Sequence, residues 1–154
     1  MVKLFDVNEQ NWLEIVSLKV NEEQKRFLDS PVGILARGYC YRSCNARVYG
    51  ISNEEHVIGV ALVKDMEEEP ACYDLQQFMI DRRFQNNGYG TEALRLILAR
   101  LIEEGKYSQV EVCVHQDDAA ALRMYRKVGF EDTGYIDEEV PDCRNLMYRF
   151  DRNN

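Results

Sequence analysis

Proline and long apolar runs are scarce in this sequence. Three prolines among 154 residues, together with a hydrophobic fraction of 45%, favour a folded globule over a disordered chain. No apolar stretch approaches the length of a membrane span, and the first residues lack the apolar core of a signal peptide. We therefore expect a cytoplasmic protein without a membrane partner, built as one domain over residues 1–154.

The cysteine pattern of disulfide-bonded or metal-binding proteins is missing as well. The five cysteines are an odd number, which fits reduced thiols better than a disulfide framework. Cys40 and Cys44 could suggest a pair of metal ligands, but no second pair follows and the two histidines are scattered. The sequence therefore predicts no metal site.

Positive charge is the third deficit. The chain carries 27 acidic and 19 basic residues, a formal net charge of −8. A surface of that sign repels phosphate backbones, so we expect no nucleic-acid partner. It attracts cationic small molecules or basic peptides instead, although many proteins are acidic for solubility alone.

Hydrophobic periodicity predicts an α/β (α+β) fold with one sheet covered by helices. The order is two helices, an antiparallel pair of strands, and then strands alternating with helices. The predicted helices cover residues 8–20, 22–28, 88–104 and 118–128, and the predicted strands cover residues 46–52, 56–65, 72–80, 109–114, 130–136 and 145–151.

The stretch QNNGYG places Gly88 and Gly90 between a predicted strand and a predicted helix. The first turn of a helix has unpaired N–H groups and partial positive charge, and a diphosphate can accept those hydrogen bonds where no side chain blocks it. The alternative is that the two glycines only serve a tight turn. A Walker loop is excluded because no lysine follows Gly90, and a dinucleotide fingerprint stays possible with Ala93 at the third glycine position.

Two motifs carry a resemblance to a known family. QNNGYG resembles the acetyl-CoA signature of the GCN5-related N-acetyltransferases (GNAT), and AALRMYRKVGF at residues 120–130 resembles their second signature. The chain is most similar to the bacterial spermine/spermidine acetyltransferases. The resemblance implies a GNAT-like domain: a mostly antiparallel mixed sheet with a splayed parallel pair, about four flanking helices and a possible homodimer.

The resemblance also implies a function. It is the direct transfer of the acetyl group of acetyl-CoA to a small cationic amine, most of all the primary amine of a polyamine such as spermidine or spermine. Two alternatives stay open. The chain could acetylate a protein N-terminus or lysine, or it could be a CoA-binding sensor without turnover.

The same resemblance assigns the cofactor-binding residues. The end of the third strand holds the pantetheine arm, the glycine loop holds the diphosphate, and an aspartate stands where relatives have a cofactor-contacting asparagine. These residues are Phe78, Met79 and Ile80, then Gln85, Asn86, Asn87, Gly88, Tyr89, Gly90 and Thr91, and finally Asp118.

Tyr125 matches the family tyrosine that acts as general acid near the sulfur, and a packed core aromatic is the alternative. Many relatives carry a carboxylate base at the position of Gln76, which cannot take up a proton. Asp74 lies two residues earlier, on the same face of a strand, and we expect it to substitute as the base.

Acidic and aromatic residues could line the acceptor cleft of a polyamine enzyme. The alternative is that most of the acidic runs are solvated charges and that the tyrosines serve packing. The candidates are Glu22, Glu23, the acidic runs at 67–69 and 137–139, and Tyr39, Tyr41 and Tyr135.

Overall fold

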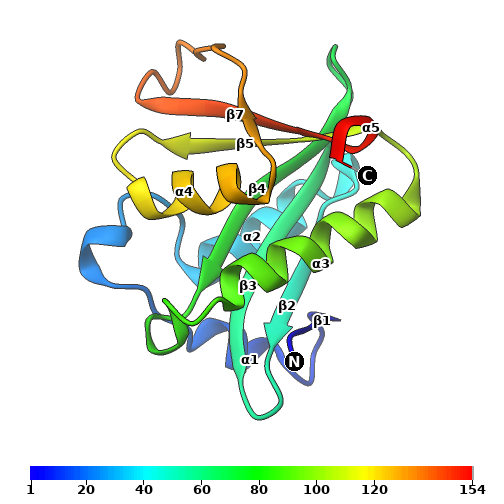
Figure 1. Ribbon diagram of the computed structural model, residues 1–154. Coiled ribbons are helices and arrows are strands. Elements are labelled where there is room, and N and C mark those ends of the chain that lie inside the picture. Colours follow the sequence, from blue (N-terminus) through cyan, green and yellow to red (C-terminus); the bar gives the residue numbers. More distant parts are fainter. Residues whose placement is uncertain (154) are drawn as a thin grey trace.

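A seven-stranded sheet with helices on both faces organises residues 1–153, the part of the chain that the computed structural model describes (Figure 1). The strand order is β1-β2-β3-β4-β5-β7-β6; β4 and β5 pair in parallel and the other neighbours pair antiparallel. The predicted mixed α/β fold is confirmed. The elements are β1 (Lys3–Asp6), α1 (Trp12–Val16), α2 (Pro31–Cys40), β2 (Arg47–Ser52), β3 (Val57–Met66), β4 (Cys72–Ile80), α3 (Tyr89–Glu104), β5 (Gln109–His115), α4 (Ala119–Val128), β6 (Glu131–Asp132), β7 (Cys143–Arg149) and α5 (Phe150–Asn153).

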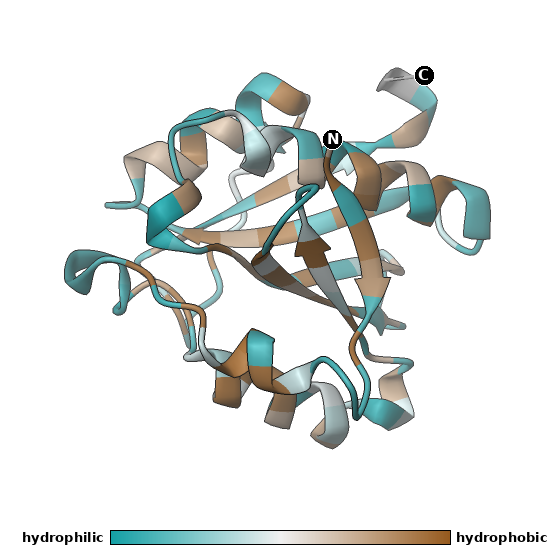
Figure 2. Cartoon of the chain, turned by 90° about the horizontal axis from the view of Figure 1, so that it is seen from below, coloured by the Kyte–Doolittle hydropathy of each residue, from teal (hydrophilic) through white to brown (hydrophobic). Residues whose placement is uncertain are grey.

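Two hydrophobic cores lie on opposite faces of the sheet. The larger one packs α3 and α4 against the strands, with Leu94 and Ile97 among its fully buried residues. The smaller one packs α1 and α2 through Ile15 and Ile34. Figure 2 shows hydrophobic residues on the strands and on the inward surfaces of the helices. Burial of these apolar faces is the main stabilising contribution to such a layered fold.

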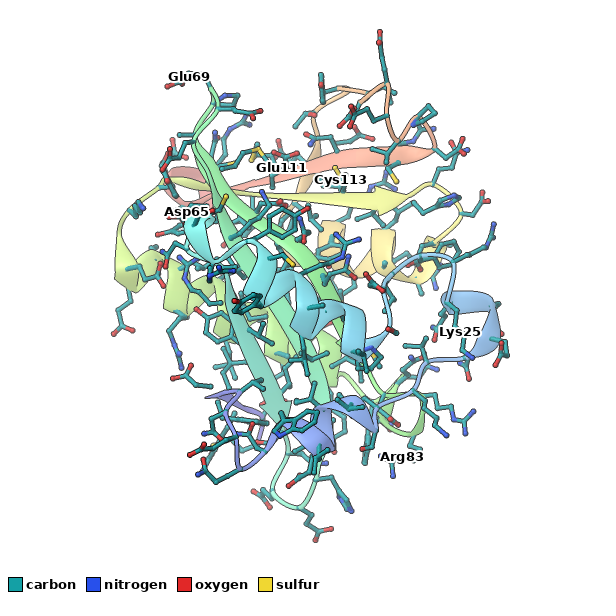
Figure 3. All side chains as sticks on the ribbon, turned by 180° about the vertical axis from the view of Figure 1, so that it is seen from behind. Lys25, Asp65, Glu69, Arg83, Glu111 and Cys113 are labelled. Carbon is teal, nitrogen blue, oxygen red and sulfur yellow. The ribbon has the colours of Figure 1, made fainter. Side chains whose placement is uncertain are left out.

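One half of the sheet lacks a helical cover on the side of α2. Figure 3 shows α2 crossing the β2–β4 part of the sheet, while Glu111 and Cys113 project from β5 beyond the helix. We call this side of β5 and β7 the open half-face. Cys113 is exposed there and Glu111 is partly exposed, whereas Asn145 and Met147 of β7 are buried. The opposite side of the same strands packs in the larger core.

The first helix is shorter than the periodicity predicted. We expected a helix over residues 8–20, whereas α1 covers only Trp12–Val16. The side chain of Asn8 accepts a hydrogen bond from the backbone N–H of Gln10 at 2.9 Å, and that of Asn11 accepts one from the N–H of Asn8 at 2.8 Å. Such local bonds favour turns over helix, so the helix begins late.

The predicted second helix was placed wrongly. Only the 3-10 turn Glu22–Gln24 forms in the stretch 22–28, and a helix that was not predicted, α2, begins at Pro31. The Ser30 hydroxyl accepts a hydrogen bond from the N–H of Gly33 at 3.1 Å. Pro31 occupies the first helical position, where its missing N–H needs no partner. The serine and proline therefore start a helix at this site.

The strands and helices between residues 46 and 128 are confirmed, and the last part of the chain differs. The strand expected at 130–136 is reduced to Glu131–Asp132, because Gly134 adopts a φ of 78° and leaves the strand. The edge strand β1 was not predicted, since its four residues are too short to show alternation. Within residues 1–153, no helix has the length and apolar character needed to cross a bilayer.

Candidate active site

The parallel strands β4 and β5 pair over only two rungs, at Tyr73 and Asp74 of β4. The register of β4 against β3 shifts at Gln76, which is an extra residue in β4 and forms a β-bulge. A bulge bends its strand and increases the local twist. Beyond it, β4 and β5 separate, as Figure 1 shows.

A cavity of about 50 Å³ lies between the separated strands, and we call it the wedge cavity. Tyr125 of α4 and Gln76 of β4 bring polar side chains to it. The segment before α2 contributes to its wall, because the rings of Phe27 and His115 lie 5.1 Å apart. The lining residues are Phe27, Leu28, Leu75, Gln76, Gln77, Phe78, Val112, Cys113, Val114, His115, Asp118, Ala121 and Tyr125.

A larger cavity of about 260 Å³ adjoins the wedge cavity, and we call it the loop cleft. Leu28, Phe78, Asp118 and Ala121 line both cavities, so the two spaces form one elongated site. The lining residues are Val20, Gln24, Leu28, Phe78, Met79, Ile80, Gln85, Asn86, Gly88, Gly90, Thr91, Asp118, Ala120, Ala121 and Met124.

The start of α3 forms the far wall of the loop cleft and lacks a side-chain cap. Gly88 is its N-cap residue with a φ of 81°, and among the described residues no side chain caps its first turn. In contrast, Ser30 and Asp118 cap α2 and α4 with their own oxygens. The first-turn N–H groups of α3 therefore remain available to an anion.

The two glycines also have structural reasons to be glycine. The left-handed backbone of Gly88 disfavours any residue with a Cβ atom. A Cβ at Gly90 would lie 3.1 Å from Sδ of Met124, so Gly90 lets α3 approach α4. Gly88 therefore does serve a tight turn, as the alternative explanation held. A role in anion binding is compatible with this, because Gly88 and Gly90 both line the loop cleft.

Most residues that the sequence assigned to cofactor binding lie together. Asn87 and Tyr89 do not line the loop cleft. The Asn87 amide donates to the carbonyl of Gln85 at 3.0 Å, and Tyr89 packs beside the ring of Phe84. The residues that do line it are Phe78, Met79, Ile80, Gln85, Asn86, Gly88, Gly90, Thr91 and Asp118.

Buried polar contacts hold the loop between β4 and α3 in place. The Asp81 carboxylate accepts hydrogen bonds from the backbone N–H groups of Lys19 and Arg83, both at 2.9 Å. Burial alone would raise the pKa of Asp81, but its hydrogen bonds outweigh this effect and lower it. The Gln85 amide donates to the carbonyl of Ile80 at 2.9 Å. No sequence pattern pointed to Asp81, which holds in place the loop that leads to the cleft.

Tyr125 is buried against Phe78 and Phe130, with ring centroids 6.5 and 5.2 Å away. Within residues 1–153 its hydroxyl has no hydrogen-bond partner, and no fully buried side-chain oxygen or nitrogen is unsatisfied. The hydroxyl therefore faces the wedge cavity. Burial, reinforced by Asp118, raises the pKa of Tyr125 above its ordinary value. The phenol stays protonated near neutral pH and can donate a proton or a hydrogen bond.

The two aspartates of the predicted site occupy different places. Asp118 caps α4, lines both cavities, and has a pKa that burial raises although the N–H of Ala121 opposes this. Asp74 lines neither cavity. Burial raises its pKa to about 6, with Lys64 at 3.4 Å opposing this shift and Glu111 reinforcing it.

A polar network that no sequence pattern predicted adjoins the wedge cavity at Gln76. The Gln76 side-chain oxygen accepts a hydrogen bond from Nη1 of Arg37 at 3.4 Å. The same guanidinium donates through Nε to the Asp29 carboxylate at 2.8 Å. Arg37 and Asp29 belong to α2 and its entry, so a correct prediction of that helix would have been needed to find them.

None of the acidic or aromatic candidates for an acceptor cleft lines the two cavities. Tyr39 and Tyr41 instead lie near Arg42 and Lys64 of the same chain, at 4.0 and 5.5 Å. Glu22 pairs with its neighbour Lys25. Among the described residues, no group of three or more potential ligands could hold a metal ion.

The chain is similar in sequence to known acetyltransferases. Residues 4–130 match the model of the acetyltransferase (GNAT) family. The chain is 24% identical over 137 residues to the spermine/spermidine N(1)-acetyltransferase of Bacillus subtilis, which covers 85% of this chain and 88% of that protein. In both matches the chain is compared over most of its length.

Two solved structures have a similar fold. The spermidine N-acetyltransferase of Vibrio cholerae, in complex with CoA and spermine, gives a TM-score of 0.77 at 14% identity and covers 99% of this chain and 97% of its own. The aminoglycoside acetyltransferase AAC(6')-Ib, in complex with coenzyme A, gives 0.83 at 16% identity, with 99% and 98% covered. At identities of 14% and 16%, the similarity shows a shared fold.

A charge at the start of α3 should affect stability and ligand binding in opposite directions. Thr91→Asp places a carboxylate in the uncapped first turn, where it should raise the free energy of unfolding by about 0.3–1 kcal/mol. The same charge repels a diphosphate, so coenzyme A should bind at least about tenfold more weakly. Urea unfolding and calorimetry measure the two effects. Thr91→Asn separates charge from shape, and undiminished binding by Thr91→Asp would contradict the assignment.

Proposed function

The chain belongs to the acetyltransferase (GNAT) family, and we propose that its acceptor is a primary amine of a polyamine such as spermidine or spermine. The protein is an N-acetyltransferase that uses acetyl-CoA as co-substrate. The observation that carries the acceptor proposal is the pair of carboxylates, Asp74 and Glu111, on adjacent strands beside the wedge cavity.

The open half-face has the chemistry that a polycation needs. Asp74 pairs with Lys64, whereas Glu111 accepts a hydrogen bond from the neutral amide of Asn145, so the pair retains negative charge. Cys113 connects this face to the site, because it lines the wedge cavity and its sulfur lies 3.9 Å from Glu111. One ammonium of a polyamine can bind at Glu111 while another amine reaches the cavity, which leaves Asp74 to act as the base.

In the proposed complex the cofactor occupies the elongated site. Its diphosphate accepts from the first-turn N–H groups of α3 in the loop cleft. The pantetheine arm passes along Phe78–Ile80 and Asp118, and the thioester lies in the wedge cavity. The free amine attacks the thioester carbon, and Tyr125 protonates the departing thiolate.

A panel of acceptors tests the proposed substrate class. With acetyl-CoA, spermidine or spermine should release free thiol with a kcat/KM at least about tenfold above that of an aminoglycoside or a peptide with a free N-terminus. The peptide as best acceptor would support a protein acetyltransferase instead. Tight cofactor binding without turnover of any amine would support a CoA sensor.

Tyr125→Phe should separate catalysis from cofactor binding. The variant keeps the ring contacts with Phe78 and Phe130 but cannot protonate the thiolate. We expect kcat to fall by about 10²–10⁴-fold while the Kd of coenzyme A changes little. Unchanged turnover would remove the phenol from the chemistry and leave it a packing residue.

The pH profile tests Asp74 as the base that takes the proton of the amine through water. A carboxylate with a pKa of about 6 is protonated below that pH and cannot act as a base. For the wild type, kcat/KM should therefore rise with pH up to about 6 and then level off. For Asp74→Asn, kcat/KM should instead rise tenfold per pH unit up to the pKa of the amine, about 10, because only the free amine can then react. Identical profiles would exclude this role.

The resemblance also suggests a cytoplasmic homodimer, and both features remain predictions. Sedimentation of the purified protein at micromolar concentration measures its oligomeric state. A monomer would not affect the proposed chemistry, because one chain supplies all the residues named above.

A further inference from the structure

The surroundings of Gln76 determine which way its side-chain amide is oriented. It is the bulged residue of β4 and lines the wedge cavity together with Tyr125. Its side-chain oxygen accepts from Arg37. A guanidinium has only N–H donors, so the oxygen must point toward Arg37 and the amide NH₂ must point the other way.

The NH₂ group of Gln76 has no acceptor among the described residues. Side-chain nitrogens and oxygens that are fully buried all have partners in residues 1–153, so this group is not fully enclosed, and Gln76 lines the wedge cavity. An amide donor and a phenol donor thus share a small space. A thioester offers two atoms that gain negative charge during aminolysis, the carbonyl oxygen and the sulfur.

We propose that the Gln76 NH₂ donates a hydrogen bond to the acetyl carbonyl oxygen and stabilises the oxyanion. This role rests on the proposed function. The amine lone pair forms the C–N bond, and the carbonyl π electrons move to the oxygen, which Gln76 stabilises. When the C=O bond re-forms, the C–S bond breaks, the thiolate takes a proton from Tyr125, and the nitrogen loses its extra proton to solvent.

Arg37 and Asp29 are positioning residues for this amide. The Asp29 carboxylate also accepts from the N–H of Ser30 at 2.9 Å. A Cβ atom at Gly33 would lie 2.1 Å from the same carboxylate, so glycine there makes room for it. The entry of α2 therefore fixes the guanidinium, and the guanidinium fixes which end of the Gln76 amide faces the cavity.

The direction in which Gln76→Glu changes kcat distinguishes two roles of this position: a hydrogen-bond donor to the oxyanion, or the place of a lost general base. Gln76→Glu has nearly the same shape, but its ionised carboxylate cannot donate and repels an oxyanion. We expect kcat to fall at least about 100-fold near pH 7. A carboxylate that restored a general base would raise kcat instead. Gln10→Glu, an exposed change of the same charge, is the control and should keep wild-type kcat.

Infrared spectroscopy tests the hydrogen bond without any acceptor amine. With acetyl-CoA labelled by ¹³C at the carbonyl, the wild-type complex should show a lowered C=O stretching frequency. Gln76→Leu and Gln76→Glu should lose this shift, and Arg37→Met should lose part of it because the amide can then rotate. A wild-type band without the shift, or an equal shift in the Gln76 variants, would overturn the proposal.

A failure of the Gln76 proposal can be distinguished from a failure of the proposed function. If the wild type binds acetyl-CoA with the shifted band but acetylates no polyamine, the acceptor proposal fails and the Gln76 proposal stands. If polyamines are acetylated and Gln76→Glu is as fast as the wild type or faster, only the Gln76 proposal fails.

Discussion

The site depends on the early end of pairing between β4 and β5. Parallel strands in a sheet normally continue their hydrogen bonds, but here the bulge at Gln76 bends β4 after two rungs. The backbone groups of β4 that would have faced β5 are left to other partners, and buried backbone groups need such partners. In the proposed complex the amide groups of the pantetheine arm supply them. The same separation creates the cavity that Tyr125 and Gln76 both line.

The remaining features are arranged around this opening. At one end, the uncapped start of α3 offers N–H groups to a diphosphate, and Asp81 holds the preceding loop. At the other end, Glu111 projects from β5 beyond α2 (Figure 3), and Asp74 of β4 is its neighbour across the parallel pair. An anion and a cation can therefore approach from different directions and meet at the wedge cavity. This arrangement suits a reaction between an anionic cofactor and a cationic amine.

Local patterns in the sequence were sufficient for strands β2 to β5, for α3 and α4, and for most of the residues that line the loop cleft. Gly88 and Gly90 lie close together in the sequence, at the helix start that they indicate. Tyr125 lies in a contiguous motif, so it too could be found from local sequence. The network of Gln76, Arg37 and Asp29 was beyond reach, since it joins segments 39 or more residues apart. The bulge is likewise set by pairing with β3, which no single-strand pattern reveals. The start of α2 could have been predicted from Ser30 as N-cap and Pro31 at the first helical position.

Backbone amide NMR of the ¹⁵N-labelled protein during titration with acetyl-CoA tests the central claim most directly. The account predicts that the largest chemical-shift changes fall on the first turn of α3 (residues 89–91) and on residues 75–80 of β4, where pairing with β5 has ended. Changes confined to another hollow, such as the one that Leu96 and Arg100 of α3 form with Leu4, would contradict it.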